Sequence, residues 1–225
     1  TVNVDNTMAD PPVRILNCDI GIASKNANMN ISNCDIEITT LGIVSNSYGN
    51  VDYNIHDNLI NKVHIGIGQY GNIASTQIQN NWINTRDTQM IATFTNAVTY
   101  KSPIGIDINH GLYEYDPTGG FYNNIANNHI DLKAKAGIGI NNQNSDRHQQ
   151  ILDNTVYLSN NSADPITASD VYACFGIVNM NAKKTSLKAN YMYGSPSLQG
   201  FNSRNRIGLL MSYSPNNILE CNKVK

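Results

Sequence analysis

The side chains best suited to acid–base chemistry gather in one short stretch near the middle of the chain. Its carboxylate and imidazole members are Asp107, His110, Glu114 and Asp116. Asp107 together with Glu114 or Asp116 would supply the two carboxyl groups that cleavage of a glycosidic bond requires. These four residues are the candidate catalytic residues. The alternative is that they are ordinary solvated charges in a loop.

Aromatic and basic side chains flank this stretch. The candidate substrate-binding residues are Lys101, Tyr113, Tyr115, Arg147 and Arg204. Aromatic rings pack against the apolar faces of sugars, while charged groups hydrogen-bond to hydroxyls. This combination favours a carbohydrate ligand.

Metal and cofactor chemistry is not indicated. The four cysteines have neither CxxC spacing nor a neighbouring His cluster, so no zinc site is predicted. One acidic residue on a strand does not make a calcium site, which needs several oxygen ligands. No phosphate loop, nucleophile elbow or HExxH motif is present. We therefore expect no metal and no cofactor.

Charge and hydrophobicity limit which kinds of partner the protein is expected to bind. The net charge is −2 and no basic run occurs, which argues against nucleic acid. No apolar stretch approaches the roughly 18 residues of a membrane span. Hydrophobic residues make up 40% of the chain and charged residues only 14%, so a sizeable core is expected.

A six-residue motif that recurs eight times indicates what positions these side chains. It reads apolar, any residue, Asn or Asp, Asn or Cys, any residue, apolar, and the last two copies are degenerate. The copies begin at Ile15, Ile31, Ile55, Ile78, Ile125, Ile151, Leu187 and Leu219. Because asparagine favours tight turns and tolerates left-handed backbone, each copy predicts a strand, a turn and a second strand.

A second motif, glycine followed by an aliphatic residue, lies between these copies. Its alternation with period two predicts a strand in which the aliphatic residues point inward and the glycines outward. The glycines concerned are Gly66, Gly68, Gly139 and Gly176. A glycine-lined sheet would let a sugar chain approach the backbone closely. Asp107 and Asn109 take outward positions on the fourth of these strands, and Gly21 begins a shortened copy.

The alternation of the two motifs predicts repeated coils. Spacings between copies of the first motif are 16, 24, 23, 47, 26, 36 and 32 residues, and the shortest complete coils of 23 or 24 residues fit three short strands. Stacking such coils about 4.8 Å apart buries their aliphatic residues. We predict an all-β, right-handed parallel β-helix, a solenoid of about eight coils with three strands each. A β-sandwich is disfavoured because no Asn-Gly or Asp-Gly hairpin pattern occurs.

Stacked coils would place the turn asparagines in a single file, each amide donating to the carbonyl of the next. The predicted file includes Asn58, Asn81, Asn128 and Asn154. Cys18 and Cys34 replace asparagine in two adjacent copies, so we expect them to stack as small buried side chains. A disulfide between them is open on Cα distance but disfavoured by parallel side chains.

The Ile-x-Asn-Asn-x-Ile and Gly-Ile-x-Ile motifs together resemble the pectin-lyase-like superfamily of right-handed parallel β-helices, over roughly residues 13–225. That superfamily holds lyases, hydrolases, epimerases, phage tailspikes and adhesins, so the resemblance is specific for fold and not for activity. The Asn-rich, Cys-Asn-containing style also resembles β-helix segments of large secreted bacterial surface proteins. It implies an extracellular or cell-surface location in a bacterium.

The resemblance further implies that the asparagine turn joins the second and third strands and that the Gly-Ile strands form the first sheet, flanked by loops. Long insertions are predicted at residues 84–103, 111–120, 157–174 and 193–206. Of the polygalacturonase motifs only a fragment remains, Asn109 and His110 before a glycine. The esterase segment and the acidic calcium site of pectate lyases are also missing.

Three functions stay open. The first is a non-catalytic structural, adhesion or glycan-binding platform. The second is a polysaccharide lyase or glycosidase with its cleft on the Gly-Ile sheet of coils four to seven, and the third is a spacer. Expected partners are a polysaccharide or surface glycan and neighbouring domains. We expect residues 1–225 to be one β-helix domain of a chain that continues past Lys225, since neither end shows a capping helix.

Overall fold

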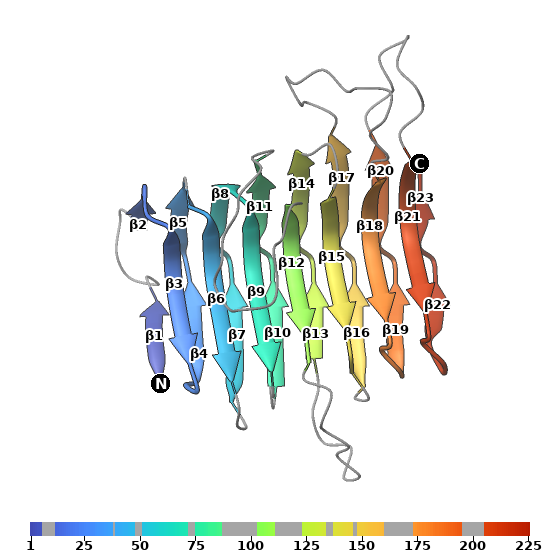
Figure 1. Ribbon diagram of the computed structural model, residues 1–225, viewed down its shortest axis with the longest axis horizontal. Coiled ribbons are helices and arrows are strands. Elements are labelled where there is room, and N and C mark those ends of the chain that lie inside the picture. Colours follow the sequence, from blue (N-terminus) through green and yellow to red (C-terminus); the bar gives the residue numbers. More distant parts are fainter. Residues whose placement is uncertain are drawn as a thin grey trace.

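The protein is a solenoid of three parallel β-sheets, here called A, B and C. The computed structural model describes residues 1–5, 12–37, 39–47, 51–71, 75–86, 103–110, 123–133, 137–145, 148–159, 173–194 and 205–225. Every regular element within these ranges is a strand. Figure 1 shows the strands stacked in chain order along the long axis of the molecule.

Each of the first seven coils contributes one strand to each sheet, in the order A, B, C, and the last described strands, β22 and β23, belong to sheets A and B. Sheet A comprises β1 (Val2–Asp5), β4 (Met29–Ser32), β7 (Asp52–His56), β10 (Ser75–Gln79), β13 (Asn123–Ala126), β16 (Gln149–Leu152), β19 (Thr185–Lys188) and β22 (Ile218–Glu220). Sheet B comprises β2 (Val13–Leu16), β5 (Cys34–Glu37), β8 (Leu59–Val63), β11 (Trp82–Thr85), β14 (His129–Lys133), β17 (Thr155–Ser159), β20 (Tyr191–Gly194) and β23 (Lys223–Val224). Sheet C comprises β3 (Ile20–Lys25), β6 (Leu41–Ser47), β9 (Ile65–Gly71), β12 (Ile104–Asn109), β15 (Gly137–Gln143), β18 (Ala173–Met180) and β21 (Asn205–Ser212).

The predicted fold is therefore confirmed as a right-handed parallel β-helix. We number the coils one to eight, so that coil four contains β10, β11 and β12 and coil eight contains β22 and β23. Parallel strands joined by a crossover take the right-handed connection, since the twist of the strands favours it. In the part that the structure describes, no helix is long and apolar enough to cross a membrane.

The core is built from aliphatic residues stacked upon equivalent residues of the next coil. In sheet A one inward row runs through Ile31, Ile55, Ile78, Ile125 and Ile151. In sheet B the inward row runs through Ile36, Ile60, Ile83, Ile130 and Val156. All ten side chains are buried, and each contributes about 2 kcal/mol through removal from water. β-Branched residues suit these rows because they pack well on a pleated surface.

The asparagine file joins sheet A to sheet B, as predicted. The side-chain amides of Asn58, Asn81, Asn128, Asn154 and Asn190 each donate to the amide oxygen of the next member, over 2.9–3.0 Å. Each also donates to a backbone carbonyl of the preceding coil, as Asn128 does to Ile78 over 2.9 Å. The cost of burying these amides is thus offset by repeated pairing.

The residue before each member of the file has left-handed backbone. Seven such residues have φ between 53° and 56°: Asn33, Asp57, Asn80, Asn127, Asp153, Ala189 and Cys221. Five of the seven are Asn or Asp, the residue types that adopt this conformation most readily. The recurring Asn/Asp of the motif is therefore explained by backbone geometry, and the following Asn by the file.

The expectation for Cys18 was wrong. The first motif copy is not an asparagine turn, because Ile15 lies in sheet B opposite Ile36 and the residue opposite Cys34 is Val13. Cys34 does belong to the file: its backbone N–H donates to Asn58 Oδ1 over 3.1 Å. Both cysteines are free thiols.

The outward orientation expected for most glycines was also wrong. A Cβ on Gly66 would lie 2.5 Å from the buried Ile83 side chain and 2.5 Å from the carbonyl oxygen of Gly105 in the next coil. Gly139 and Gly176 meet interior side chains in the same way, so this row faces inward. Only Gly68 of the expected four faces outward, where the ring of Tyr70 covers it.

Candidate functional site

Asp107, the candidate acid on sheet C, lies on the outer face of β12 and is fully buried. Its carboxylate accepts hydrogen bonds from the hydroxyl of Tyr70 over 2.9 Å and from the amide of Asn141 over 2.8 Å. The ring of Tyr70 crosses the bare backbone of Gly68 to reach it. Both of these donors are neutral, and the carboxylate is away from solvent. Its catalytic role stays a prediction.

His110, the candidate imidazole, is buried on the interior side of the sheet. The amides of Asn123 and Gln149 lie 3.2 Å and 3.0 Å from its Nε2. These two neighbours are themselves buried interior residues. Because Asp107 faces the outer side of β12 and His110 follows it by an odd number of residues, the two side chains lie on opposite faces of the strand.

The remaining candidates lie outside the described residues. They are Lys101, Tyr113, Glu114, Tyr115, Asp116, Arg147 and Arg204. The strand bounds place residues 86–103, 160–172 and 195–204 between sheet B and sheet C, and residues 110–122 between sheet C and sheet A. The predicted insertions 84–103, 157–174 and 193–206 each overlap a strand at one end or both, and residues 111–120 lie outside the described residues, so the insertions stay a prediction.

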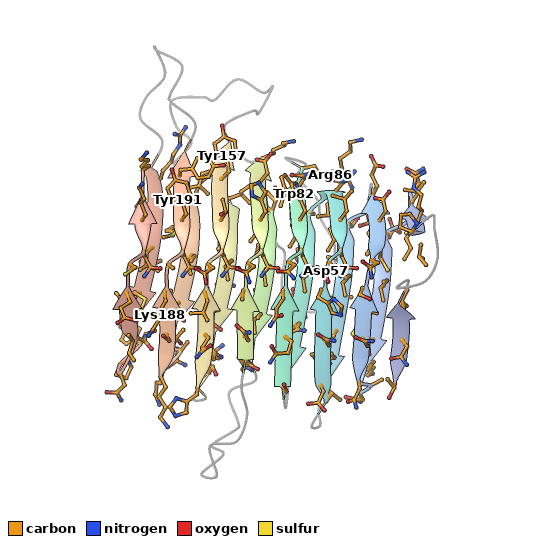
Figure 2. All side chains as sticks on the ribbon, turned by 180° about the vertical axis from the view of Figure 1, so that it is seen from behind. Asp57, Trp82, Arg86, Tyr157, Lys188 and Tyr191 are labelled. Carbon is orange, nitrogen blue, oxygen red and sulfur yellow. The ribbon has the colours of Figure 1, made fainter. Side chains whose placement is uncertain are left out.

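The outer face of sheet B carries side chains that the sequence reasoning did not select. Its first outward row consists of Arg14, Asp35, Leu59, Trp82, His129, Thr155, Tyr191 and Lys223. Its second outward row consists of Leu16, Glu37, Asn61, Asn84, Asp131, Tyr157 and Tyr193. Trp82 is 50% exposed and Leu59 is 40% exposed. Large apolar groups at the surface of a sheet are the informative exceptions to burial. Figure 2 shows Trp82, Tyr157 and Tyr191 on the strands of this sheet.

The aromatic residues of this face form two stacks. In coils four and five the rings of Trp82 and His129 stack with centroids 4.0 Å apart. In coils six and seven Tyr193 stacks with Tyr157 at 4.7 Å and with Tyr191 at 4.9 Å. Trp82 thus stacks on one neighbouring ring and Tyr193 on two. Ring edges, polar groups and the ring faces that no other ring covers are left to meet a ligand.

Polar side chains are interleaved with the rings. The indole N–H of Trp82 donates to Asn84 over 3.3 Å, and the amide of Asn84 donates to Asn61 in the preceding coil. The ammonium group of Lys223 lies 5.5 Å from the ring centroid of Tyr191, a cation–π distance. Rings, amides and cations therefore alternate on one flat surface.

Among the described residues, cations outnumber carboxylates on this face from coil three onward. The cationic residues on or beside these strands are Lys62, Arg86, Lys133, Lys223 and Lys225. Lys62 pairs with Glu37 at 2.7 Å and Lys133 pairs with Asp131 at 3.5 Å. Arg206 is not part of this face: it lies opposite the buried Cys174, and its guanidinium group lies beside Gly194 on the inward side of β20. A chain of net charge −2 thus presents a locally positive surface here. We call this surface, comprising coils three to eight of sheet B, the aromatic–basic face.

Burial within the two stacks shifts two pKa values. Burial lowers the pKa of His129 below its usual 6.5, and the nearby carboxylate of Asp131 opposes the shift. Burial raises the pKa of Tyr193, and Tyr157, Tyr191 and Asp131 add to that effect. Both rings are consequently neutral near pH 7 and add no charge of their own to the face.

A signal for this face was present in the repeat. The residue directly after each file member is the first outward position of sheet B, and reading it from coil three to coil eight gives Leu59, Trp82, His129, Thr155, Tyr191 and Lys223. The Gly-Ile motif marks sheet C and does not point to this row. Among the described residues, no group of three or more His, Cys, Asp or Glu side chains is placed to hold a metal ion. The chain matches no family model, no curated protein and no solved structure.

Proposed function

We propose that this chain is a non-catalytic, carbohydrate-binding β-helix of a secreted or cell-surface protein, and that it binds anionic polysaccharide on the aromatic–basic face. The observation that carries the proposal is the group of aromatic side chains on this face, with Trp82 exposed and the others partly exposed, lying beside cations in a chain of net charge −2. Aromatic rings with amide and charged neighbours are the usual lining of sugar sites.

The geometry of the stacks favours an oxygen-rich and anionic ligand. Aromatic rings carry negative faces and positive edges, and the ring stacks of this face leave ring edges accessible. Ring edges, phenol hydroxyls and ammonium groups are therefore among the groups offered to a ligand. Carboxylates and hydroxyls of a uronate polymer match these positive and polar groups.

Support for the non-catalytic form comes from the enclosure of the two described catalytic candidates. Asp107 is fully buried and His110 lies on the interior side of the strand. A lyase or glycosidase on sheet C is the alternative proposal. Membership of the pectin-lyase-like superfamily belongs to the same proposal, and the asparagine file between consecutive strands supports it. A bacterial, extracellular location is part of the proposal through that resemblance.

The test measures binding to immobilised polymannuronate, dextran sulfate and neutral dextran. We expect binding to both anionic polymers, weak or no binding to dextran, and a loss of affinity as salt screens the cations. Trp82→Ala and Tyr191→Ala should each lower the affinity about tenfold, equivalent to about 1.4 kcal/mol. Equal binding to dextran and dextran sulfate would contradict the anionic preference.

Two control variants lie off the face. Tyr213→Ala removes an aromatic side chain that is 87% exposed on the turn between sheets C and A. Lys188→Ala removes a cation on sheet A, which Figure 2 shows well away from Trp82. Neither should change affinity. Release of sugar products that Asp107→Ala abolishes would instead support the enzyme alternative.

A further inference from the structure

We infer that the polysaccharide lies parallel to the solenoid axis and contacts both aromatic stacks at once, so that the ligand is an extended polymer and not a short or terminal sugar. This inference rests on the function proposed above. It concerns the direction and the length of the ligand, which the presence of a binding face does not by itself determine.

Groups of like chemistry repeat along the axis and not across it. Within one coil a strand of sheet B offers two or three outward side chains, whereas the first outward row continues through all eight coils. Coils are spaced about 4.8 Å apart. An extended sugar chain has a repeat of similar length, so it would meet equivalent groups at successive units only when it runs along the axis.

The outer members of the two stacks, Trp82 in coil four and Tyr191 in coil seven, are three coil steps apart along the axis. Three steps amount to about 14 Å. Between these two rings the face continues with Asp131, Thr155 and Tyr157, all partly exposed. A ligand across the strands would reach one stack only. A ligand along the axis reaches both, and joining two weak contacts raises affinity through effective concentration.

The cations are also arranged in a line. Lys62, Arg86 and Lys133 follow one another in coils three, four and five, at the side of the face toward sheet C. Lys223 occupies coil eight, beyond the second stack. A single compact anion is held by converging donors, as in a bidentate pair. Cations spread over successive coils instead suit a polymer with one negative charge per repeat.

The experiment is a length series of oligomannuronates, from the disaccharide to about eight units, titrated against the wild type. We expect affinity to rise steeply up to roughly four units, the length that spans both stacks, and then to level off. Trp82→Ala and Tyr191→Ala should each weaken the octamer about tenfold. On the disaccharide at most one of the two variants should have an effect.

A cycle with the double variant tests whether one ligand engages both stacks. For an octamer along the axis, the second substitution should cost less than it does alone, because the bridged mode is already lost. Trp82→Phe and Tyr191→Phe should restore most of the affinity, and the thermal unfolding curve of each variant should match the wild type.

The outcomes separate the two proposals. Tight binding that is independent of length, with both variants affecting disaccharide and octamer equally, would overturn the axial inference and leave the carbohydrate-binding proposal standing. No binding to any oligomannuronate, dextran sulfate or polymannuronate would overturn both. Tighter binding to oligo-dT of matched charge would assign the face to nucleic acid and overturn both as well.

Discussion

Replacement of Asn128 by alanine is the sharpest test of the scaffold, because the neighbouring residue provides a matched control. Asn128 is a buried member of the asparagine file, and Asn127 is the exposed left-handed residue before it. The equivalent of Asn127 in coil seven is Ala189, with φ 53°. Asn127→Ala therefore repeats a substitution that the chain already contains, whereas Asn128→Ala removes a link from the file.

The size of the effect follows from the hydrogen bonds lost. Asn128 donates to Ile78 O and to Asn154 Oδ1, and it accepts from the backbone and side-chain amides of Asn81. The side chain of Asn81 keeps two backbone partners, including Ile55 O. The buried backbone N–H of Asn81 and the carbonyl of Ile78 lose the partner that Asn128 provided. At about 1–3 kcal/mol for each stranded group, the free energy of unfolding should fall by about 3 kcal/mol.

Trp82 provides the assay, since it is the single tryptophan of the chain and its ring stacks on His129, directly after Asn128. Urea unfolding followed by tryptophan fluorescence gives the free energy of unfolding near the substitution. Asn127→Ala should cost less than about 1 kcal/mol. If Asn128→Ala lowers the free energy of unfolding no more than Asn127→Ala does, the file does not stabilise the solenoid and our reasoning is wrong.

Three further predictions concern stability. Gly105→Ala should lower the free energy of unfolding by about 3 kcal/mol in the same urea assay. The added Cβ would lie 2.6 Å from the carbonyl oxygen of Gly139, a backbone atom that cannot move aside. An unchanged free energy of unfolding would contradict the inward orientation of the glycine row. Cys34→Asn should raise the free energy of unfolding by about 1 kcal/mol in the same urea assay, because the substitution extends the file by one amide. A destabilised variant would show that the first coils do not accept an amide. Because the folded state lowers the pKa of His129 from its usual 6.5, the free energy of unfolding should fall as pH drops below about 6.5. His129→Gln should flatten that dependence, and an unchanged pH profile would argue against burial as the cause.

The repeat was sufficient to predict the fold because the aliphatic pair and the turn asparagines indicate the same coil. The aliphatic pair predicts the inward rows, and Asn58, Asn81, Asn128 and Asn154 stack in one file as predicted. The failure at Cys18 has a physical reason. The first two motif copies are 16 residues apart, fewer than the 23 or 24 that a complete coil requires, so they cannot both be the same turn.

The orientation of the glycines could not be read from alternation alone. Ile65 and Ile67 pair with Ile104 and Ile106, but no pairing joins Gly66 to Gly105 between them. The strand is irregular at that point, and an inward glycine fits where the chain turns into sheet C because the next coil passes too close for a side chain. Period-two reasoning presumes a regular pleat, which is absent there.

The candidate site was predicted less well than the fold. Aromatic and charged side chains were predicted to bind sugar, but most of the candidate residues lie in the loops flanking sheet C. The burial of Asp107 depends on Tyr70 and Asn141, which lie 37 and 34 residues away in sequence. Only stacking of the coils reveals which distant residues share a face, and the same holds for the row that contains Trp82 and Tyr191.

The asparagine file also gives the molecule a direction. In every amide from Asn58 to Asn190, the N–H that joins the file points toward coil eight and the oxygen points toward coil one, so the amide-to-amide hydrogen bonds all run in one direction. Reversal of one amide would set two oxygens against each other on one side and two N–H groups on the other. The row must therefore keep a common orientation throughout, and the polarity of the solenoid is fixed by all of its members together.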